Sequence, residues 1–67
     1  MKADAKVLDV QIENQGSIFL FTPMNETARE WMRANIYDPI MFGQSWAVEH
    51  RYAYDLAQGM MADGLVV

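Results

Sequence analysis

The sequence has 67 residues, of which 52% are hydrophobic, and nine acidic against five basic side chains give a formal net charge of −4. A chain of this length forms one small domain, here residues 1–67, with a thin stability margin. The absence of Cys excludes disulfides, and a lone His without thiolates argues against structural zinc. The acidic balance argues against direct nucleic-acid binding, and no apolar run approaches the ~20 residues of a membrane span.

The N-terminal third of the chain predicts a β-hairpin. Apolar and polar residues alternate from Val7 to Glu13, which is typical of a half-buried strand. A short loop follows, in which Gly16 or Asn14 is expected to take the positive φ of a turn. Residues 17–22 are apolar on both faces and predict a second strand, which Pro23 ends because proline donates no hydrogen bond to a ladder. Residues 1–5 are polar and are expected to be frayed.

Helix signals come next. Asn25 is a favourable N-cap, and Glu26 places a negative charge in the first turn. Apolar residues at helical spacing predict an amphipathic helix over residues 26–35, with Trp31 and Met32 facing the core. Asp38-Pro39 then predicts a break, and residues 37–44 are expected to form a loop that carries four large apolar side chains.

The C-terminal third predicts strand, helix and strand. Residues 45–49 read as a short strand and residues 51–63 as a helix. The expected buried stripe of that helix is Tyr52, Leu56, Gly59 and Met60. Gly64 is expected in a left-handed stop, followed by a final strand at residues 65–67.

The predicted fold class is therefore α+β. We expect a small two-layer domain of order β-β-α-β-α-β, with a mainly antiparallel sheet and two helices on one face. In the alternative arrangement the last strand pairs with a partner chain.

The sequence offers little for catalysis. Glu49-His50-Arg51 is the one grouping with a general-base appearance, but these residues mark a junction from strand to helix, where neighbouring side chains diverge. The four glycines are isolated, so the sequence has no Gly-rich phosphate loop. We expect a protein that is not an enzyme, with no cofactor and no metal.

Two sets of residues are candidates for partner binding. Acidic candidates are Asp9, Glu13, Glu26 and Glu30, and they form either a solvated surface or a strip that competes with phosphates for basic side chains. Apolar candidates are Phe42, Tyr54 and Met61, which a two-layer domain of this size has little room to bury. They are either covered by the loop at residues 37–44 or exposed as a contact patch, because aromatic and Met side chains are enriched at interfaces.

Several short motifs carry a resemblance to a known group. These are Gly16-Ser17-Ile18-Phe19-Leu20-Phe21-Thr22-Pro23, Ala28-Arg29-Glu30-Trp31, Val48-Glu49-His50-Arg51-Tyr52, Gly59-Met60 and Asp63-Gly64-Leu65. Over residues 13–67 the chain resembles short proteins encoded by bacteriophages, prophages and related mobile elements. The group's central loop carries aromatic-Phe-Gly, whereas this chain keeps only Phe42-Gly43 of that motif, after Met41.

The resemblance implies a function through binding. Small acidic phage proteins without catalytic residues commonly bind a host complex, so we expect a protein of the host cytoplasm that inhibits a nucleic-acid-handling defence complex, such as a restriction or CRISPR effector, by occlusion. The alternative is a phage accessory or assembly protein that uses its apolar patch for self-association. The expected partners are a host protein complex or a second copy in a homodimer, and neither nucleic acid nor a membrane.

Overall fold

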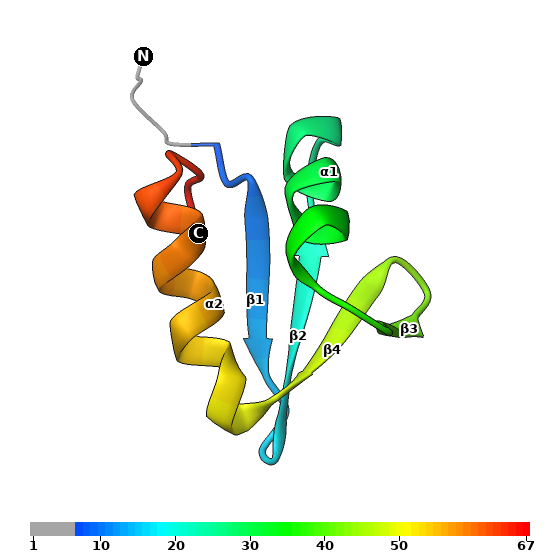
Figure 1. Ribbon diagram of the computed structural model, residues 1–67. Helices are drawn as coiled ribbons and strands as arrows, with labels where there is room; N and C mark the ends of the chain where they lie inside the picture. The colour runs from blue at the N-terminus through cyan, green and yellow to red at the C-terminus, as the bar shows by residue number, and fades with distance from the viewer. Residues whose placement is uncertain (1–6) are drawn as a thin grey trace.

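The computed structural model describes residues 7–67, and the segment expected to be frayed lies outside them. Its elements are β1 (Val10–Asn14), β2 (Ile18–Pro23), α1 (Glu26–Asn35), β3 (Ile40–Phe42), β4 (Ser45–Glu49) and α2 (His50–Ala62). The strands form one antiparallel sheet in the order β1-β2-β4-β3. Both helices lie against this sheet (Figure 1). The prediction of a small α+β domain is confirmed. No helix within the described range is long and apolar enough to cross a membrane.

The β1–β2 hairpin forms where the alternating residues 7–13 and the apolar residues 17–22 predict it. Gly16 adopts the positive φ, at 95°, and its N–H donates to the side-chain oxygen of Asn14 at 2.8 Å. Pro23 closes β2 opposite Val10. Because the flanking hydrogen bond runs from the N–H of Met24 to the carbonyl of Asp9, Pro23 occupies a position that needs no N–H toward β1.

A single core lies between the sheet and the helices. Cross-strand partners share a face, and the register pairs Phe21 with Trp46 and Phe19 with Val48. All the buried strand residues therefore lie on one face, which places both helices on that face as predicted. The buried hydrophobic residues are Val10, Phe21, Ala28, Met32, Trp46, Val48, Ala53, Met60 and Leu65. No helix of residues 7–67 covers the other face of the sheet.

Both helices have the ends that the sequence predicts. The side-chain oxygen of Asn25 accepts the N–H of Ala28 at 2.8 Å, which caps α1. At the end of α2, Gly64 has φ 92°. The N–H of Leu65 reaches the carbonyl of Met60 at 2.9 Å, as in a Schellman motif.

Two predicted elements are wrong, and they change the element order to β-β-α-β-β-α. Residues 37–44 are not a loop, because Ile40–Phe42 forms β3 and pairs with β4 across a tight turn in which Gly43 has φ 62°. Residues 65–67 do not form a strand. Val66 instead accepts the N–H of Asp9 at 2.8 Å, while its own N–H donates to the Asp9 carboxylate at 2.7 Å. The Asp9 carboxylate therefore accepts the Val66 N–H that a backbone carbonyl would accept in a regular pair of strands.

The predicted stripe of the second helix is partly wrong. Tyr52 is 55% exposed, and Ala53 is buried in its place. The helix begins at His50, one residue earlier than predicted. Ala53 and Met60 are the buried residues of α2, and their spacing of seven residues places both on one side of the helix. Tyr52 precedes Ala53 and is therefore turned about 100° away from that side.

Candidate partner-binding site

Asp9 has a structural role, because its carboxylate is hydrogen-bonded within the fold. One oxygen accepts the N–H of Val66 and the other accepts the side-chain amide of Asn25 at 2.6 Å. These two donors, Val66 first, lower the pKa of the Asp9 carboxyl below its ordinary value. Asp9 thereby connects the start of β1, the cap of α1 and the C-terminal segment. Both of its carboxylate oxygens accept hydrogen bonds within the fold.

The other acidic candidates lie apart from one another. Glu13 is exposed on β1, on the sheet face without helices. Glu26 pairs with Arg29 at 2.6 Å and with Arg33 at 3.7 Å, which offsets its charge. Glu30 is exposed on α1. The four predicted carboxylates do not form one strip.

The apolar candidates are exposed, but they too are separated. Phe42 lies on β3, whereas Tyr54 and Met61 lie on α2, seven residues apart on one side of the helix. Tyr54 lines a small cavity with Ile12 of β1. The prediction that these side chains are surplus to the core agrees with their exposure, but they do not make one patch.

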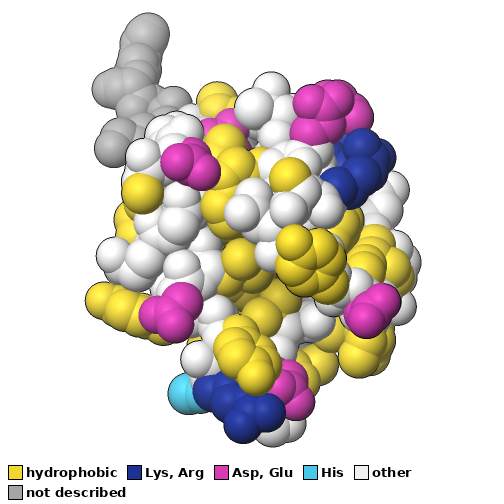
Figure 2. All heavy atoms as spheres, viewed as in Figure 1, with side chains coloured by type: hydrophobic (Ala, Val, Ile, Leu, Met, Phe, Trp, Pro, Cys, Tyr) yellow, Lys and Arg dark blue, Asp and Glu magenta, His cyan; other side chains and the backbone are white. Residues whose placement is uncertain are grey.

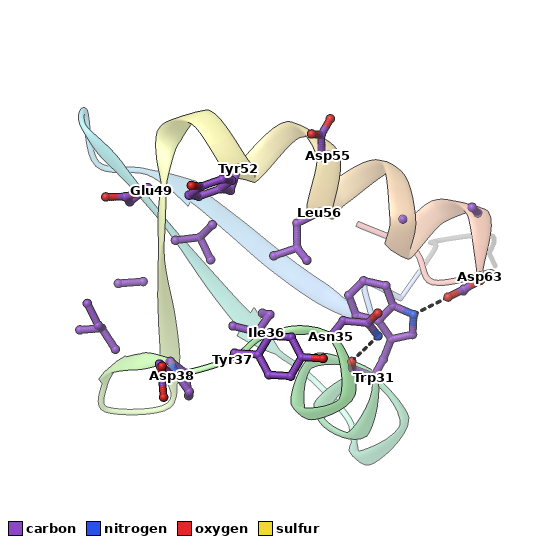
Figure 3. Close-up of a pocket in the computed structure, with 16 residues that line it drawn as sticks. Trp31, Asn35, Ile36, Tyr37, Asp38, Glu49, Tyr52, Asp55, Leu56 and Asp63 are labelled. Carbon is purple, nitrogen blue, oxygen red and sulfur yellow. Dashed lines mark hydrogen bonds between the residues drawn. The ribbon is translucent and has the colours of Figure 1, made fainter.

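A different surface brings apolar and acidic side chains together. It is an open groove of about 760 Å³ between α1 and α2, above β4. Figure 2 shows hydrophobic side chains at the surface in the hollow between the two helices. In Figure 3, Leu56 points into the groove from α2, while Ile36 and Tyr37 enter from the end of α1. Val48 supplies part of the floor from β4.

The rim of the groove is acidic. No Lys or Arg of residues 7–67 lines the groove. Four carboxylates do, and they are Asp38, Glu49, Asp55 and Asp63. Glu49 accepts Arg51 Nε at 3.4 Å, and Asp63 accepts the indole N–H of Trp31 at 2.6 Å. Within residues 7–67, Asp38 and Asp55 make no ion pair. They are therefore the two rim charges that remain available to a ligand.

Trp31 and Asp63 join the two helices at one end of the groove. Their hydrogen bond is exposed and appears in Figure 3 as a dashed line between α1 and the end of α2. Beneath it, the Trp31 ring packs over Gly59, where an added Cβ would lie 3.5 Å from the ring. Two tyrosines flank the groove elsewhere, and Tyr37 is 86% exposed. Exposed aromatic side chains of this kind are common anchors in protein interfaces.

The Glu49-His50-Arg51 triplet does not form a His–carboxylate pair. The imidazole of His50 packs near Phe19, with ring centroids 5.3 Å apart, and the Glu49 carboxylate faces Arg51 instead. No group of three or more His, Cys, Asp or Glu side chains in residues 7–67 is placed to hold a metal ion.

Sequence reasoning missed the groove for an identifiable reason. Its four carboxylates are far apart in the sequence, and each has an ordinary local explanation. Asp38 lies at a chain break before Pro39, and Glu49 lies at the junction from strand to helix. Asp55 lies on a helix surface, and Asp63 lies at a helix end. Because residues 37–44 were predicted as a loop, Tyr37 and Asp38 were not expected in a defined position. In the structure they precede β3, which pairs with β4. The one available signal was Tyr52, whose place in the expected buried stripe brought it close to Leu56.

Comparisons add no family to this description. The chain matches no protein-family model, no curated protein and no solved structure.

Proposed function

We propose that this chain is a small acidic binding protein whose groove between α1 and α2 holds an apolar, basic segment of a partner protein. One observation carries the proposal: the groove has an apolar floor and four carboxylates around it, and its lining takes no cationic side chain from the described part of the chain. The apolar floor would supply affinity, and the carboxylates would favour Lys and Arg and speed association. Asp38 and Asp55 are the two acids expected to pair with the partner.

The proposed consequence of binding is occlusion. Nucleic-acid-binding proteins contact phosphates largely through Lys and Arg side chains. A groove that holds a segment with such side chains would withdraw it from nucleic acid. The resemblance of residues 13–67 to phage proteins supplies the expected setting, which is inhibition of a host defence complex in the host cytoplasm.

A fluorescence-anisotropy titration tests the groove. The probe is a short labelled peptide of leucine and lysine, compared with a leucine–glutamate peptide and a serine–lysine peptide. We expect only the leucine–lysine probe to bind measurably, and binding should weaken as salt rises. Because Asp55→Lys replaces an attraction by a repulsion, it should weaken binding by about three- to tenfold.

Glu30→Lys is the matched control. It makes the same change of charge on an exposed helical position outside the groove lining. Equal losses for Asp55→Lys and Glu30→Lys would show that net charge, and not the groove, determines binding. Equal binding of the serine–lysine peptide would show that the apolar floor has no role.

The open face of the sheet favours self-association as a second candidate function. Leu20 and Ala47 are cross-strand partners on this face, and Ile40 pairs with Ala47 beside them. Ile40 and Phe42 are exposed at its β3 edge. A second copy packed face to face would cover these side chains and give the homodimer expected of an accessory or assembly protein.

Light scattering tests the second candidate. A dimer at micromolar concentration that Phe42→Glu converts to a monomer would support it. A monomer at all concentrations, or a dimer unaffected by Phe42→Glu, would exclude this face.

A further inference from the structure

The outer edge of β1 carries backbone groups that the sheet does not use. Hydrogen bonds from Met24 N–H to the Asp9 carbonyl and from Gln15 N–H to the Ile18 carbonyl show that residues 9 and 15 bond toward β2. Because the direction alternates along an antiparallel strand, Ile12 and Asn14 direct their N–H and C=O groups away from β2. Within residues 7–67, neither of them makes a backbone hydrogen bond on that side.

A second observation confirms which residues of β1 direct their backbone groups away from β2. Val10, which is two residues before Ile12, donates its N–H to the carbonyl of Val66 at 3.2 Å. The C-terminal segment therefore covers the first outward-facing position of β1, and within residues 7–67 it makes no backbone hydrogen bond to Ile12 or Asn14. The next outward positions along β1 are those of Ile12 and Asn14.

An apolar cavity lies beside these unpaired groups. It has a volume of about 340 Å³, and its lining includes Ile12 and Phe19 from the sheet and Ala53, Tyr54 and Ala57 from α2. In Figure 1, α2 lies on the side of β1 that faces away from β2. Tyr54 is 72% exposed at the mouth of the cavity. Free backbone donors and acceptors next to an apolar cavity are what an added strand requires.

We propose that the β1 edge accepts an extended segment of another protein as an additional strand. The N–H and C=O groups of Ile12 and Asn14 would hydrogen-bond to its backbone. Alternate side chains of a strand point to opposite faces. One apolar side chain would therefore enter the cavity under α2, and the next would lie beside Glu13 on the open face. A Lys or Arg there would complement the Glu13 carboxylate.

A second copy of β1 does not fit this edge. Symmetric pairing centred on Ile12 would place Asn14 of one copy opposite Val10 of the other, whose outward N–H is taken by Val66. Pairing centred on Glu13 would place two Glu13 carboxylates directly opposite each other, which is unfavourable. A foreign segment with a basic residue at that position meets neither obstacle. This site is separate from the groove and does not depend on the function proposed for it.

Nuclear magnetic resonance of the full chain tests the proposal, with a short peptide of alternating valine and lysine as the probe. We expect slowed hydrogen exchange of the Ile12 and Asn14 amides and chemical-shift changes at Ala57 and Tyr54. A version of the probe with N-methylated valines lacks the backbone donors and should bind at least about tenfold more weakly, a change that corresponds to about 1.4 kcal/mol.

Glu13→Lys should weaken the probe several-fold, whereas Glu30→Lys, with the same change of charge, should not. Four results would overturn the proposal: no binding, equal binding of the N-methylated probe, shifts confined to the groove around Leu56, or protection of Ile12 and Asn14 by a second copy without the probe.

Discussion

At the scale of single residues, Asp9 has the largest structural role among the predicted site residues. Its carboxylate accepts hydrogen bonds from segments far apart in the sequence, the N-cap Asn25 and Val66 near the C-terminus. It also lies directly before Val10, the first residue of β1. An acidic residue on an expected solvent face can therefore serve the fold rather than a partner, and a charge reversal at Asp9 would test stability instead of binding.

The lowered pKa of Asp9 predicts a pH dependence of stability. A carboxyl whose pKa is lower in the folded state than its ordinary value of 3.8 stabilises the fold above that pH. The contribution is lost as pH falls through 3.8 toward the lower folded value. Asp9→Asn should therefore be less stable than the parent protein at pH 7, and the difference should shrink at pH 3. Urea unfolding at both pH values measures this.

Glu13→Gln is the control for this experiment, because it removes an exposed carboxylate from the same strand. Its urea midpoint should follow that of the parent protein at both pH values. A constant difference between Asp9→Asn and the parent across this pH range would show that the Asp9 charge contributes nothing to the fold.

At the scale of elements, the start of α1 depends on a residue outside the helix. Asn25 uses its side-chain oxygen as the cap and its side-chain amide to reach Asp9. Asp is ordinarily as good an N-cap as Asn. Here an Asp would place two carboxylates against each other, so the tertiary contact selects the amide.

Asn25 substitutions should follow an order that helix capping alone does not give. At pH 7 we expect Asn25→Ser to be less stable than the parent protein and Asn25→Asp to be less stable still. At pH 3 protonation removes the repulsion, and Asn25→Asp should approach Asn25→Ser. Thermal unfolding followed by circular dichroism provides the comparison. An Asn25→Asp variant as stable as the parent at pH 7 would contradict the role given to Asp9.

The second helix contains a glycine that packing does not require. Gly59 lies inside α2, and an added Cβ would stand 3.5 Å from the Trp31 ring, which is an ordinary contact distance. Glycine in a helix interior costs about 0.5–1 kcal/mol relative to alanine. Gly59→Ala should therefore raise the free energy of unfolding by about that amount in urea titration. A loss of stability would mean that the Trp31 ring must lie closer to the backbone of α2.

At the scale of the whole molecule, one small core supports every surface described above. Met60 is fully buried and comes from α2, whereas Val10 and Phe21 come from the sheet. Truncating a buried Met to Ala costs about 2–5 kcal/mol. Since small domains have total stabilities of about 5 kcal/mol or a little more, this loss is comparable with the whole.

Met60→Ala should consequently populate the unfolded state strongly at 25 °C. Near-ultraviolet circular dichroism, which reports on the packing of Trp31 and Trp46, should lose most of its signal. Met61→Ala is the matched control, because Met61 is the next residue and is exposed. A similar effect of the two substitutions would contradict the burial of Met60.

Much of the fold follows from local rules. Alternation predicted β1, the apolar segment before Pro23 predicted β2, and the cap and helical spacing after Asn25 predicted α1. The glycines at positions 16 and 64 predicted the hairpin turn and the C-terminal end of the second helix, and both adopt a positive φ. Each depends on residues within a few positions of one another, so the sequence determined them. The strand at residues 40–42 was missed because Asp38-Pro39 and Gly43 also suit a loop, and only the pairing of Met41 with Trp46 makes the segment extended.

The sequence by itself determined a small acidic α+β domain with more apolar side chains than its core buries. Only the tertiary structure decided which of them meet. The seven predicted binding residues lie on different surfaces, whereas the groove brings Asp38, Asp55 and Tyr37 together from segments that are far apart in the chain. Local propensity acts over one or two turns, but the neighbours of a surface side chain depend on how strands and helices pack. The same packing made Asp9 a structural acceptor and left the edge of β1 open.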